Sequence, residues 1–227
     1  LELKRNKLLR IKRTELKKEY KKRRFYWGLK PDVGLKEAVK YARRGIALDL
    51  GAGEGRNSVF LAKNGFEVEA IDKIKNGLEK CEKLSQRCNL TIKTENIDIR
   101  KFRFEKNRYS LILSIATLDF FKFSEIKKIV SKIQKSLKKD GVFYLVVFSE
   151  KDPLFNDYRG RKLKTIEKDT FYVPKLKTFQ HFFRKEELSK LFKNFKIIKI
   201  KSKKIRESHG GKSHLHYIII NIVKKRG

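Results

Sequence analysis

The stretch that decides the fold is Ala47-Leu-Asp-Leu-Gly-Ala-Gly-Glu-Gly-Arg-Asn57, where an apolar run ends in three glycines at alternate positions. Glycine has no Cβ and adopts positive φ readily, so the backbone at Gly51, Gly53 and Gly55 can pass close to a ligand. Residues 57–63 have the pattern of a helix start, whose free N–H groups point toward the same ligand. The stretch predicts the end of a first parallel strand and a turn that holds a nucleotide-like cofactor. A glycine-rich surface turn without a ligand is the alternative.

The rest of the chain alternates between predicted strands and helices. We expect strands at 46–50, 66–71, from 90, 109–115, 142–148, 195–201 and 214–223. We expect helices at 35–41, 57–63, 78–87, 185–192, and from a cap at Ser124 to a stop at Gly141. The order βαβαβαβαβαββ predicts a doubly wound, Rossmann-like α/β fold. Its seven-stranded sheet is expected to be mostly parallel, with helices on both faces and an antiparallel C-terminal strand.

The chain carries a net charge of +33, from 59 Lys and Arg against 26 Asp and Glu. A surface this basic attracts polyanions such as nucleic acid. The same Lys, Ile and Glu bias also fits an AT-rich genome or a thermophile. The charge is densest in residues 1–24, which we interpret as a basic helical arm preceding a domain of residues 25–227. A solvated helix and an RNA-contacting arm are both open interpretations of the arm.

Composition places the chain among cytoplasmic globular proteins. Its apolar fraction of 40% excludes a disordered chain, and no apolar run approaches the length of a membrane span. The N-terminus is charged and unlike a signal peptide. Cys81 and Cys88 lie two turns apart on a predicted helix, too far apart to form a disulfide. We therefore expect reduced, structural thiols in the cytoplasm.

Three acids stand at the ends of three successive predicted strands: Asp49, Asp72 and Asp98. Ala116-Thr-Leu-Asp119 follows the fourth strand. In open parallel sheets, ligands bind at the carboxyl ends of the strands where the strand order reverses. The acids therefore predict a ligand site at this edge. Chance placement of common loop residues is the alternative.

The glycine spacing and these acids resemble those of the class I S-adenosylmethionine (SAM) dependent methyltransferases. Within that class the chain is similar to the tellurite-resistance and thiopurine methyltransferase-like group, over about residues 25–225. A dinucleotide site would instead show G-x-G-x-x-G. The matching residues are Tyr26-Trp27, 47–57, Ala-Ile-Asp-Lys at 70–73, Asn-Ile-Asp at 96–98, 109–121, and Phe-Arg-Lys-Glu-Glu-Leu at 183–188. The basic arm lies outside the resemblance.

The resemblance implies SAM as the cofactor and gives the glycine turn its role. Asp49 would orient the turn and meet the amino group of the methionine moiety, directly or through water. Gly51, Ala52, Gly53 and Gly55 would bring the backbone close to the ligand. An acidic turn suits SAM because SAM has a cationic sulfonium and no phosphate.

The resemblance also implies contacts with the nucleoside part of SAM. Asp72 would accept hydrogen bonds from the two ribose hydroxyls, with Lys73 beside it. Asp98 and the N–H of Ile99 would read the adenine edge.

Other positions would line or cover the pocket. Ala116 and Thr117 would line it on the side of the fourth strand. Trp27 or Tyr26 would cover it or stack on the adenine, unless this aromatic pair is a core anchor. Arg56 is interpreted either as a pocket cation or as a solvated helix-cap residue.

The expected function is methyl transfer to an unidentified acceptor, with a small molecule slightly favoured. The alternative is an RNA-binding protein or an RNA methyltransferase that uses the basic arm. No Asn-Pro-Pro-Tyr or Asp-Pro-Pro-Tyr follows the fourth strand, which argues against the usual exocyclic amino methyltransferases of nucleic acids. No residue is identified as a catalytic base. Residues 150–184, with Asp157-Tyr158-Arg159 and Tyr172, are expected to form much of the acceptor pocket.

Three histidines gather near the C-terminus: His209, His214 and His216. His214 and His216 alternate onto one face of a strand, so a substrate pocket or a transition metal is one interpretation. Polar residues of a turn and an edge strand are the simpler one. Because no Cys or acid accompanies them in the sequence, we predict no metal site. His181, among phenylalanines, is expected to pack.

Overall fold

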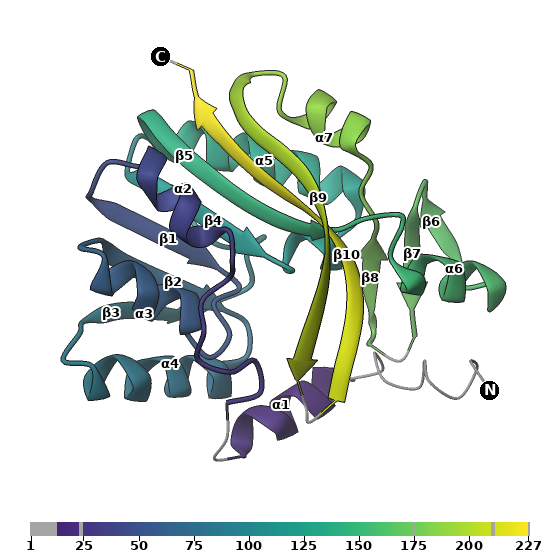
Figure 1. Cartoon of the computed structure of the whole chain (residues 1–227), viewed down its shortest axis with the longest axis horizontal. Coiled ribbons are helices and arrows are strands. Elements are labelled where there is room, and N and C mark those ends of the chain that lie inside the picture. The colour runs from purple at the N-terminus through teal and green to yellow at the C-terminus, as the bar shows by residue number, and fades with distance from the viewer. Residues whose placement is uncertain (1–12, 23–24, 175, 210–211, 227) are drawn as a thin grey trace.

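The computed structural model describes residues 13–22, 25–174, 176–209 and 212–226, and the side chains of these except 13–16, 207–209 and 212. A seven-stranded sheet lies between two layers of helices (Figure 1). The strand order is β3-β2-β1-β4-β5-β10-β9, and β10 runs antiparallel to both of its neighbours while the pairs among β1 to β5 are parallel. The predicted sheet is confirmed. Its strands are β1 (Ile46–Leu50), β2 (Glu67–Asp72), β3 (Ile92–Asn96), β4 (Tyr109–Ile115), β5 (Leu137–Phe148), β9 (Phe195–His209) and β10 (Lys212–Lys225).

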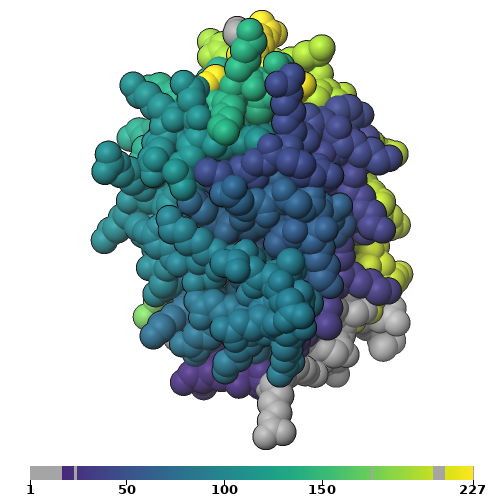
Figure 2. Space-filling model, turned by 90° about the vertical axis from the view of Figure 1, so that its left-hand side faces the viewer, coloured from purple at the N-terminus to yellow at the C-terminus, as the bar shows by residue number. Residues whose placement is uncertain are grey.

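Alternating side chains of the central strands build a core on each face of the sheet. On one face, Ala47 of β1 packs with α2 (Leu35–Tyr41), α3 (Arg56–Lys63) and α4 (Lys75–Arg87). On the other, Leu48 packs with α5 (Phe123–Ser136) and α7 (Lys185–Leu191). Figure 2 shows the side of the molecule that α3 and α4 cover. The prediction of helices on both faces is confirmed.

Several predicted boundaries are wrong. The predicted order places a helix between the third and fourth strands, but the structure has none in residues 97–108. Helix α5 is capped by Lys122 and not by Ser124, because the carboxylate of Glu125 accepts the Lys122 N–H (3.1 Å). It ends at Ser136 and not at Gly141, since Leu137 is extended and pairs with Tyr109.

Residues 150–184, which were expected to form much of the acceptor pocket, form a folded unit in which the sequence predicted no helix or strand. They contain α6 (Pro153–Gly160) and a three-stranded antiparallel sheet of β6 (Thr165–Glu167), β7 (Thr170–Val173) and β8 (Thr178–His181). A separate apolar cluster that includes Phe155, Phe171 and Phe182 holds the unit together. Tyr158 is buried in this cluster and packs against its aromatic rings.

The C-terminal hairpin is longer than predicted. Only residues 218–224 of β10 pair with β5, whereas β9 and β10 pair along their length up to Lys212 and His209. The first part of β10, with His214 and His216, therefore extends past the carboxyl end of β5. This places both histidines beyond the carboxyl end of β5, at the edge where open parallel sheets bind ligands.

The predicted basic arm is described from residue 13 and includes α1 (Arg13–Lys21). Tyr20 of α1 is buried in a cluster with Tyr26, Ile74 and Trp27, and α1 lies beside α4. Residues 1–12 and 23–24 of the arm lie outside the described residues. The boundary at residue 24 stays a prediction. Nowhere in the described chain is a helix both long enough and apolar enough to traverse a membrane.

Candidate cofactor-binding site

The glycine turn leads from the carboxyl end of β1 into α3 and lies beside the carboxyl end of β2. Its three glycines, Gly51, Gly53 and Gly55, have φ values of 77°, 55° and 84°, which side-chain-bearing residues rarely adopt. The N–H groups of Gly51 and Ala52 both donate to the carbonyl of Ile71 (2.8 and 3.0 Å). The turn is therefore fixed to the end of β2, and Gly55 caps the start of α3.

Two of these glycines also make room for neighbouring elements. A Cβ on Gly51 would lie 2.4 Å from the side chain of Thr117, which follows β4. A Cβ on Gly55 would lie 2.3 Å from the Sγ of Cys81 in α4. Cys81 is a buried, free thiol, and Cys88 is also free, as predicted. The glycines thus let β1, β4 and α4 converge around the turn.

Asp49 lies beneath the turn and is almost fully buried. The hydroxyl of Ser58, in α3, donates to its Oδ2 (2.6 Å). Burial raises the pKa of Asp49 to about 7, against the lowering effect of the Ser58 hydrogen bond. This position suits the predicted role of orienting the turn.

Asp72 ends β2 and contacts the glycine turn directly. Its Oδ2 accepts the N–H of Gly53 (2.9 Å), and its Oδ1 accepts the N–H of Ile74 (2.7 Å). A carboxylate oxygen can accept two hydrogen bonds, so these contacts orient the group without exhausting its acceptor capacity. The structure therefore brings together Asp72 and the glycine turn.

Asp98 lies near Lys73, which the sequence had placed beside Asp72, and its main partner is Arg100, a residue that the sequence did not single out. Arg100 donates to Asp98 through its backbone N–H (3.0 Å), Nε (2.9 Å) and Nη2 (2.7 Å), and Lys73 Nζ is 3.4 Å away. The Arg100 hydrogen bonds hold the pKa of Asp98 well below its usual range. Ile99 is buried. The carboxylate of Asp98 is therefore already engaged by Arg100, whose side chain is half exposed.

The backbone N–H and C=O of Trp27 are bound by side chains of Glu54 and Arg56, at the glycine turn. The Trp27 N–H donates to Oε2 of Glu54 (3.1 Å), and its carbonyl accepts from Nη1 of Arg56 (3.0 Å). Arg56 therefore positions the aromatic pair, a role outside the two interpretations offered by the sequence. The ring of Tyr26 packs edge-on against that of Trp27 (4.8 Å between centroids) and is buried.

Tyr20, which sequence reasoning missed, lies over the same turn. Its hydroxyl accepts a hydrogen bond from Nε1 of Trp27 (2.7 Å). A Cβ on Gly53 would lie 3.0 Å from that hydroxyl, and a Cβ on Gly77 would lie 2.9 Å from the ring. Burial, with the nearby Asp72 carboxylate, raises the pKa of Tyr20 well above its usual value. A neutral tyrosine thus fits a slot lined by two glycines.

Ala116 and Thr117 follow β4 next to the turn, as predicted. Ala116 is exposed with φ of 47°, a left-handed conformation that is costly for alanine, and its N–H donates to Val146 (2.9 Å). The hydroxyl of Thr117 donates to the carbonyl of Ile115 (3.0 Å). The two residues complete the rim of the turn.

A buried acid and histidine cluster lies beyond the ends of β4 and β5. Oδ2 of Asp152 accepts the N–H of Tyr217 (2.9 Å) and lies 3.0 Å from Nδ1 of His216. Asp119, after β4, accepts the N–H of Phe148 through Oδ1 (2.7 Å), while its Oδ2 is buried without a hydrogen-bond partner. These contacts join strand ends that are far apart in sequence, so no local pattern could have predicted them.

Of the other histidines, His214 lies beside this cluster and His181 packs among phenylalanines. His214 stacks near His216 (6.2 Å between ring centroids) and is buried. The side chain of His209 lies outside the described residues. Within the described side chains, no group of three or more metal-binding residues is assembled. His181 packs between Phe123 and Phe183, as predicted, and bonds Thr170 and Glu187.

Asp119 is expected to make the stability of the protein fall as the pH rises. Burial raises the pKa of Asp119 to about 8, whereas an unfolded aspartate titrates near about 3.9. The folded state therefore holds a proton that the unfolded state loses between these values, at a maximum of about 1.4 kcal/mol per pH unit. Asp119→Asn should flatten the dependence of the free energy of unfolding on pH, measured by urea denaturation at several pH values. An unchanged slope in the variant would contradict this assignment.

Comparison with known proteins gives consistent matches. A family model described as Tellurite resistance protein TehB matches residues 15–154. A Haemophilus influenzae protein named "Probable S-adenosyl-L-methionine-dependent methyltransferase TehB" is 27% identical over 139 residues, which are 59% of this chain and 48% of that protein. The chain thus spans about half the length of the curated relatives that it matches.

Solved structures share the fold. The crystal structure of TehB from Haemophilus influenzae matches with a TM-score of 0.67 and 18% identity, covering 93% of this chain and 66% of that one. A Burkholderia thailandensis 1,6-didemethyltoxoflavin-N1-methyltransferase, solved with its substrate and S-adenosylhomocysteine, matches with a TM-score of 0.61 and 18% identity. That match covers 86% of this chain and 79% of the other. At these identities the likeness shows the fold alone.

Proposed function

Because the chain belongs to the family of the tellurite resistance protein TehB, we propose that it transfers a methyl group from SAM to an acceptor molecule. The observation that carries the proposal is the bond from the Gly53 N–H to Asp72, which joins a positive-φ glycine turn to an acid at the end of β2 (2.9 Å). A carboxylate at this place can accept hydrogen bonds from the two hydroxyls of a ribose. SAM has no phosphate, so its site needs no further N–H groups to bind an anion. Asp72 and the glycine turn therefore fit SAM.

We assign the cofactor contacts along the edge of the sheet. Asp72 would hold the ribose hydroxyls, and Asp49 would keep the turn in place beneath the methionine end. Gly51, Ala52, Gly53 and Gly55 would present their backbone. Asp98 would meet the adenine amino group once Arg100 turns away, with Lys73 and the N–H of Ile99 beside it. Trp27 would cover the pocket, while Ala116 and Thr117 would form its wall toward the acceptor. The support is that Asp72 and Thr117 contact the glycine turn, and that Lys73, next to Asp72 in the chain, lies 3.4 Å from Asp98.

The chain's own part in the reaction is orientation. SAM supplies a methyl group bonded to a cationic sulfur. The leaving group, which contains that sulfur, is uncharged after the transfer. The rigid turn, fixed by Ile71, Ser58 and Asp72, would place that methyl against the acceptor. Correct placement of two reacting groups can contribute roughly 7–11 kcal/mol to lowering a barrier. The proposal needs no dedicated base when the acceptor is already anionic.

A small-molecule acceptor is favoured over RNA. The Burkholderia thailandensis neighbour is named for a small-molecule substrate. The described end of the basic arm packs on the domain through Tyr20 instead of projecting from it. A cytoplasmic location is proposed with it, supported by the two free cysteines.

The test is transfer of label from methyl-labelled SAM to a panel of thiols, oxyanions of tellurium and selenium, small amines and RNA. Formation of S-adenosylhomocysteine that depends on one acceptor class is the expected result. The Asp72→Ala variant should lose this turnover. Equal turnover in the variant would remove the proposed site from the reaction.

Tyr20→Phe is expected to weaken SAM binding modestly, by about 0.5–1.5 kcal/mol, because the Trp27 indole loses its acceptor and the cover over the turn loosens. Titration calorimetry with SAM measures the change. Tyr41→Phe serves as the control, since Tyr41 lies exposed at the end of α2. Equal affinities for the two variants would show that Tyr20 does not act on the cofactor.

A further inference from the structure

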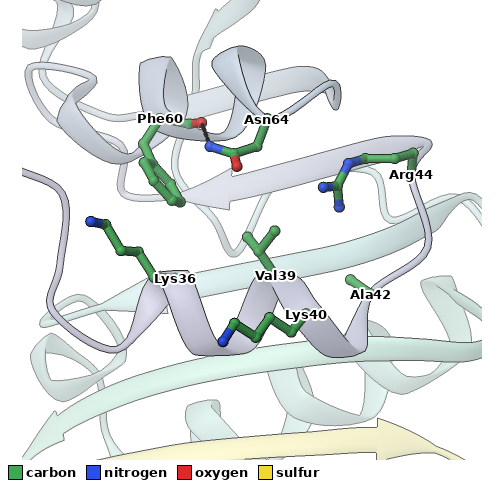
Figure 3. A pocket seen from close by; sticks show the side chains of 7 residues that line it. All are labelled: Lys36, Val39, Lys40, Ala42, Arg44, Phe60 and Asn64. Atoms are coloured by element: carbon green, nitrogen blue, oxygen red, sulfur yellow. Dashed lines mark hydrogen bonds between the residues drawn. The ribbon is translucent and has the colours of Figure 1, made fainter.

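A second pocket lies between α2 and α3, away from the glycine turn. It encloses about 410 Å³ and is lined by residues of both helices and of the segment before β1. Figure 3 shows Lys36 and Arg44 at opposite ends of it, with Val39 between them and Phe60 above. Gly55 begins α3 at the carboxyl edge of the sheet, whereas Arg44 precedes the amino end of β1. The pocket is therefore separate from the proposed cofactor site.

The polar groups at the rim of this pocket are mostly cations without acidic partners. Lys36, Lys40 and Arg44 are exposed, and no described residue forms an ion pair with any of them. The acid nearest in sequence on α2, Glu37, is paired instead with Lys199 of β9 (2.7 Å). No lining residue is acidic. Three uncompensated positive charges around one concavity favour a ligand with more than one negative charge.

The floor of the pocket favours a flat, apolar group. Val39 and Ala42 are buried, and the ring of Phe60 is half-buried and faces the pocket. The guanidinium of Arg44 is held at one end by stacking over the ring of Phe66 (4.9 Å). An aromatic face with neighbouring cations is a combination that binds a nucleobase by stacking and its phosphate by charge. The volume lies within the usual range for a small-ligand site.

We propose that this pocket binds a nucleoside phosphate, in which the base and the phosphate are joined through a sugar, presented by a free nucleotide or by a single RNA strand. Lys36 and Lys40, one helical turn apart on α2, bind the phosphates. Phe60 stacks on the base. The site is independent of methyl transfer and gives part of the large positive charge a specific ligand.

The experiment is titration of the full chain with uridine diphosphate, whose base differs from the adenine of SAM, and with a short uridine oligonucleotide. Lys36→Glu/Lys40→Glu should weaken uridine diphosphate binding about tenfold or more, because two charge-assisted contacts are lost and two repulsions are added. The control Lys83→Glu/Lys128→Glu makes the same change in net charge at exposed positions elsewhere and should change binding less than about twofold. Phe60→Leu should weaken uridine diphosphate binding and leave inorganic diphosphate binding unchanged.

The two probes distinguish the source of the ligand. Similar affinities for both, each lost in the pocket variant, support a free nucleotide. An oligonucleotide that binds about tenfold more tightly, with the same loss, supports an RNA strand. Equal losses in the pocket and control variants would overturn the proposal, since binding would then follow net charge alone. Absence of binding by both probes would also overturn it, and neither result affects the proposed SAM site.

Discussion

Replacing Asp72 with alanine is expected to weaken SAM binding by about 1–3 kcal/mol, the usual worth of charge-assisted hydrogen bonds. The variant loses the proposed ribose acceptor and also releases the N–H groups of Gly53 and Ile74. Titration calorimetry measures the change in affinity. Asp72→Asn should lose less, because its amide oxygen still accepts one of these N–H groups while the charge is gone.

The control for this prediction is Asp140→Asn. Asp140 is a partly exposed acid whose nearest cation is Lys224 (3.7 Å), and it lies before the main part of β5. It should bind SAM like the unmodified chain. If Asp72→Ala also retains full affinity while folding normally, Asp72 does not hold the cofactor.

Gly55→Ala is expected to lower the free energy of unfolding by about 2–5 kcal/mol. A left-handed φ of 84° costs a side-chain-bearing residue about 1–2 kcal/mol, and forced overpacking adds about 1–3 kcal/mol. The overpacking arises because the new Cβ would lie 2.9 Å from the Cα of Cys81, a backbone atom that cannot rotate away. Urea denaturation measures the loss.

Gly28→Ala separates the two contributions. Gly28 has a similar φ of 69°, but no atom lies within 4 Å of an added Cβ. It should cost only the conformational part, about 1–2 kcal/mol. Adding Cys81→Ala to Gly55→Ala should not restore stability, because the Cα and Cβ of residue 81 remain in contact. Equal losses for the two glycine variants would show that the packing against α4 is unimportant.

The parts of the fold that the sequence predicted are those with strong local signals. Strands β1 and β4 and helix α2 match their predicted limits, because each is an apolar or periodic segment bounded by glycine or polar residues. Three acids marked the carboxyl edge of the sheet for the same reason, because Asp49, Asp72 and Asp98 each lie within two residues of the end of a strand.

The missed parts depend on contacts between distant residues. The unit at 150–184 is held by aromatic side chains from α6, β7 and the segment after β8, which show no periodicity along the chain. One local signal was present, since Asp152 caps α6 before Pro153 at its first turn. Tyr20 and Arg100 were missed because their roles come from packing over Gly53 and from pairing with Asp98.

The cluster of Asp119, Asp152 and His216 likewise depends on contacts between residues that are distant in the sequence. The sequence placed Asp119 after the fourth strand and His216 on the last one. Only the antiparallel insertion of β10 beside β5 brings them to one edge. The alternation of the histidines along the strand therefore does not reveal Asp152, the acidic partner of His216.

Whether the glycine turn holds SAM is measured by calorimetric titration of the full chain with S-adenosylhomocysteine, the product that SAM leaves. We expect saturable binding of one molecule per chain, with a Kd below about 1 mM. The Asp72→Ala variant should also bind S-adenosylhomocysteine more weakly than the unmodified chain. Absence of binding up to about that concentration by a correctly folded chain would contradict the account.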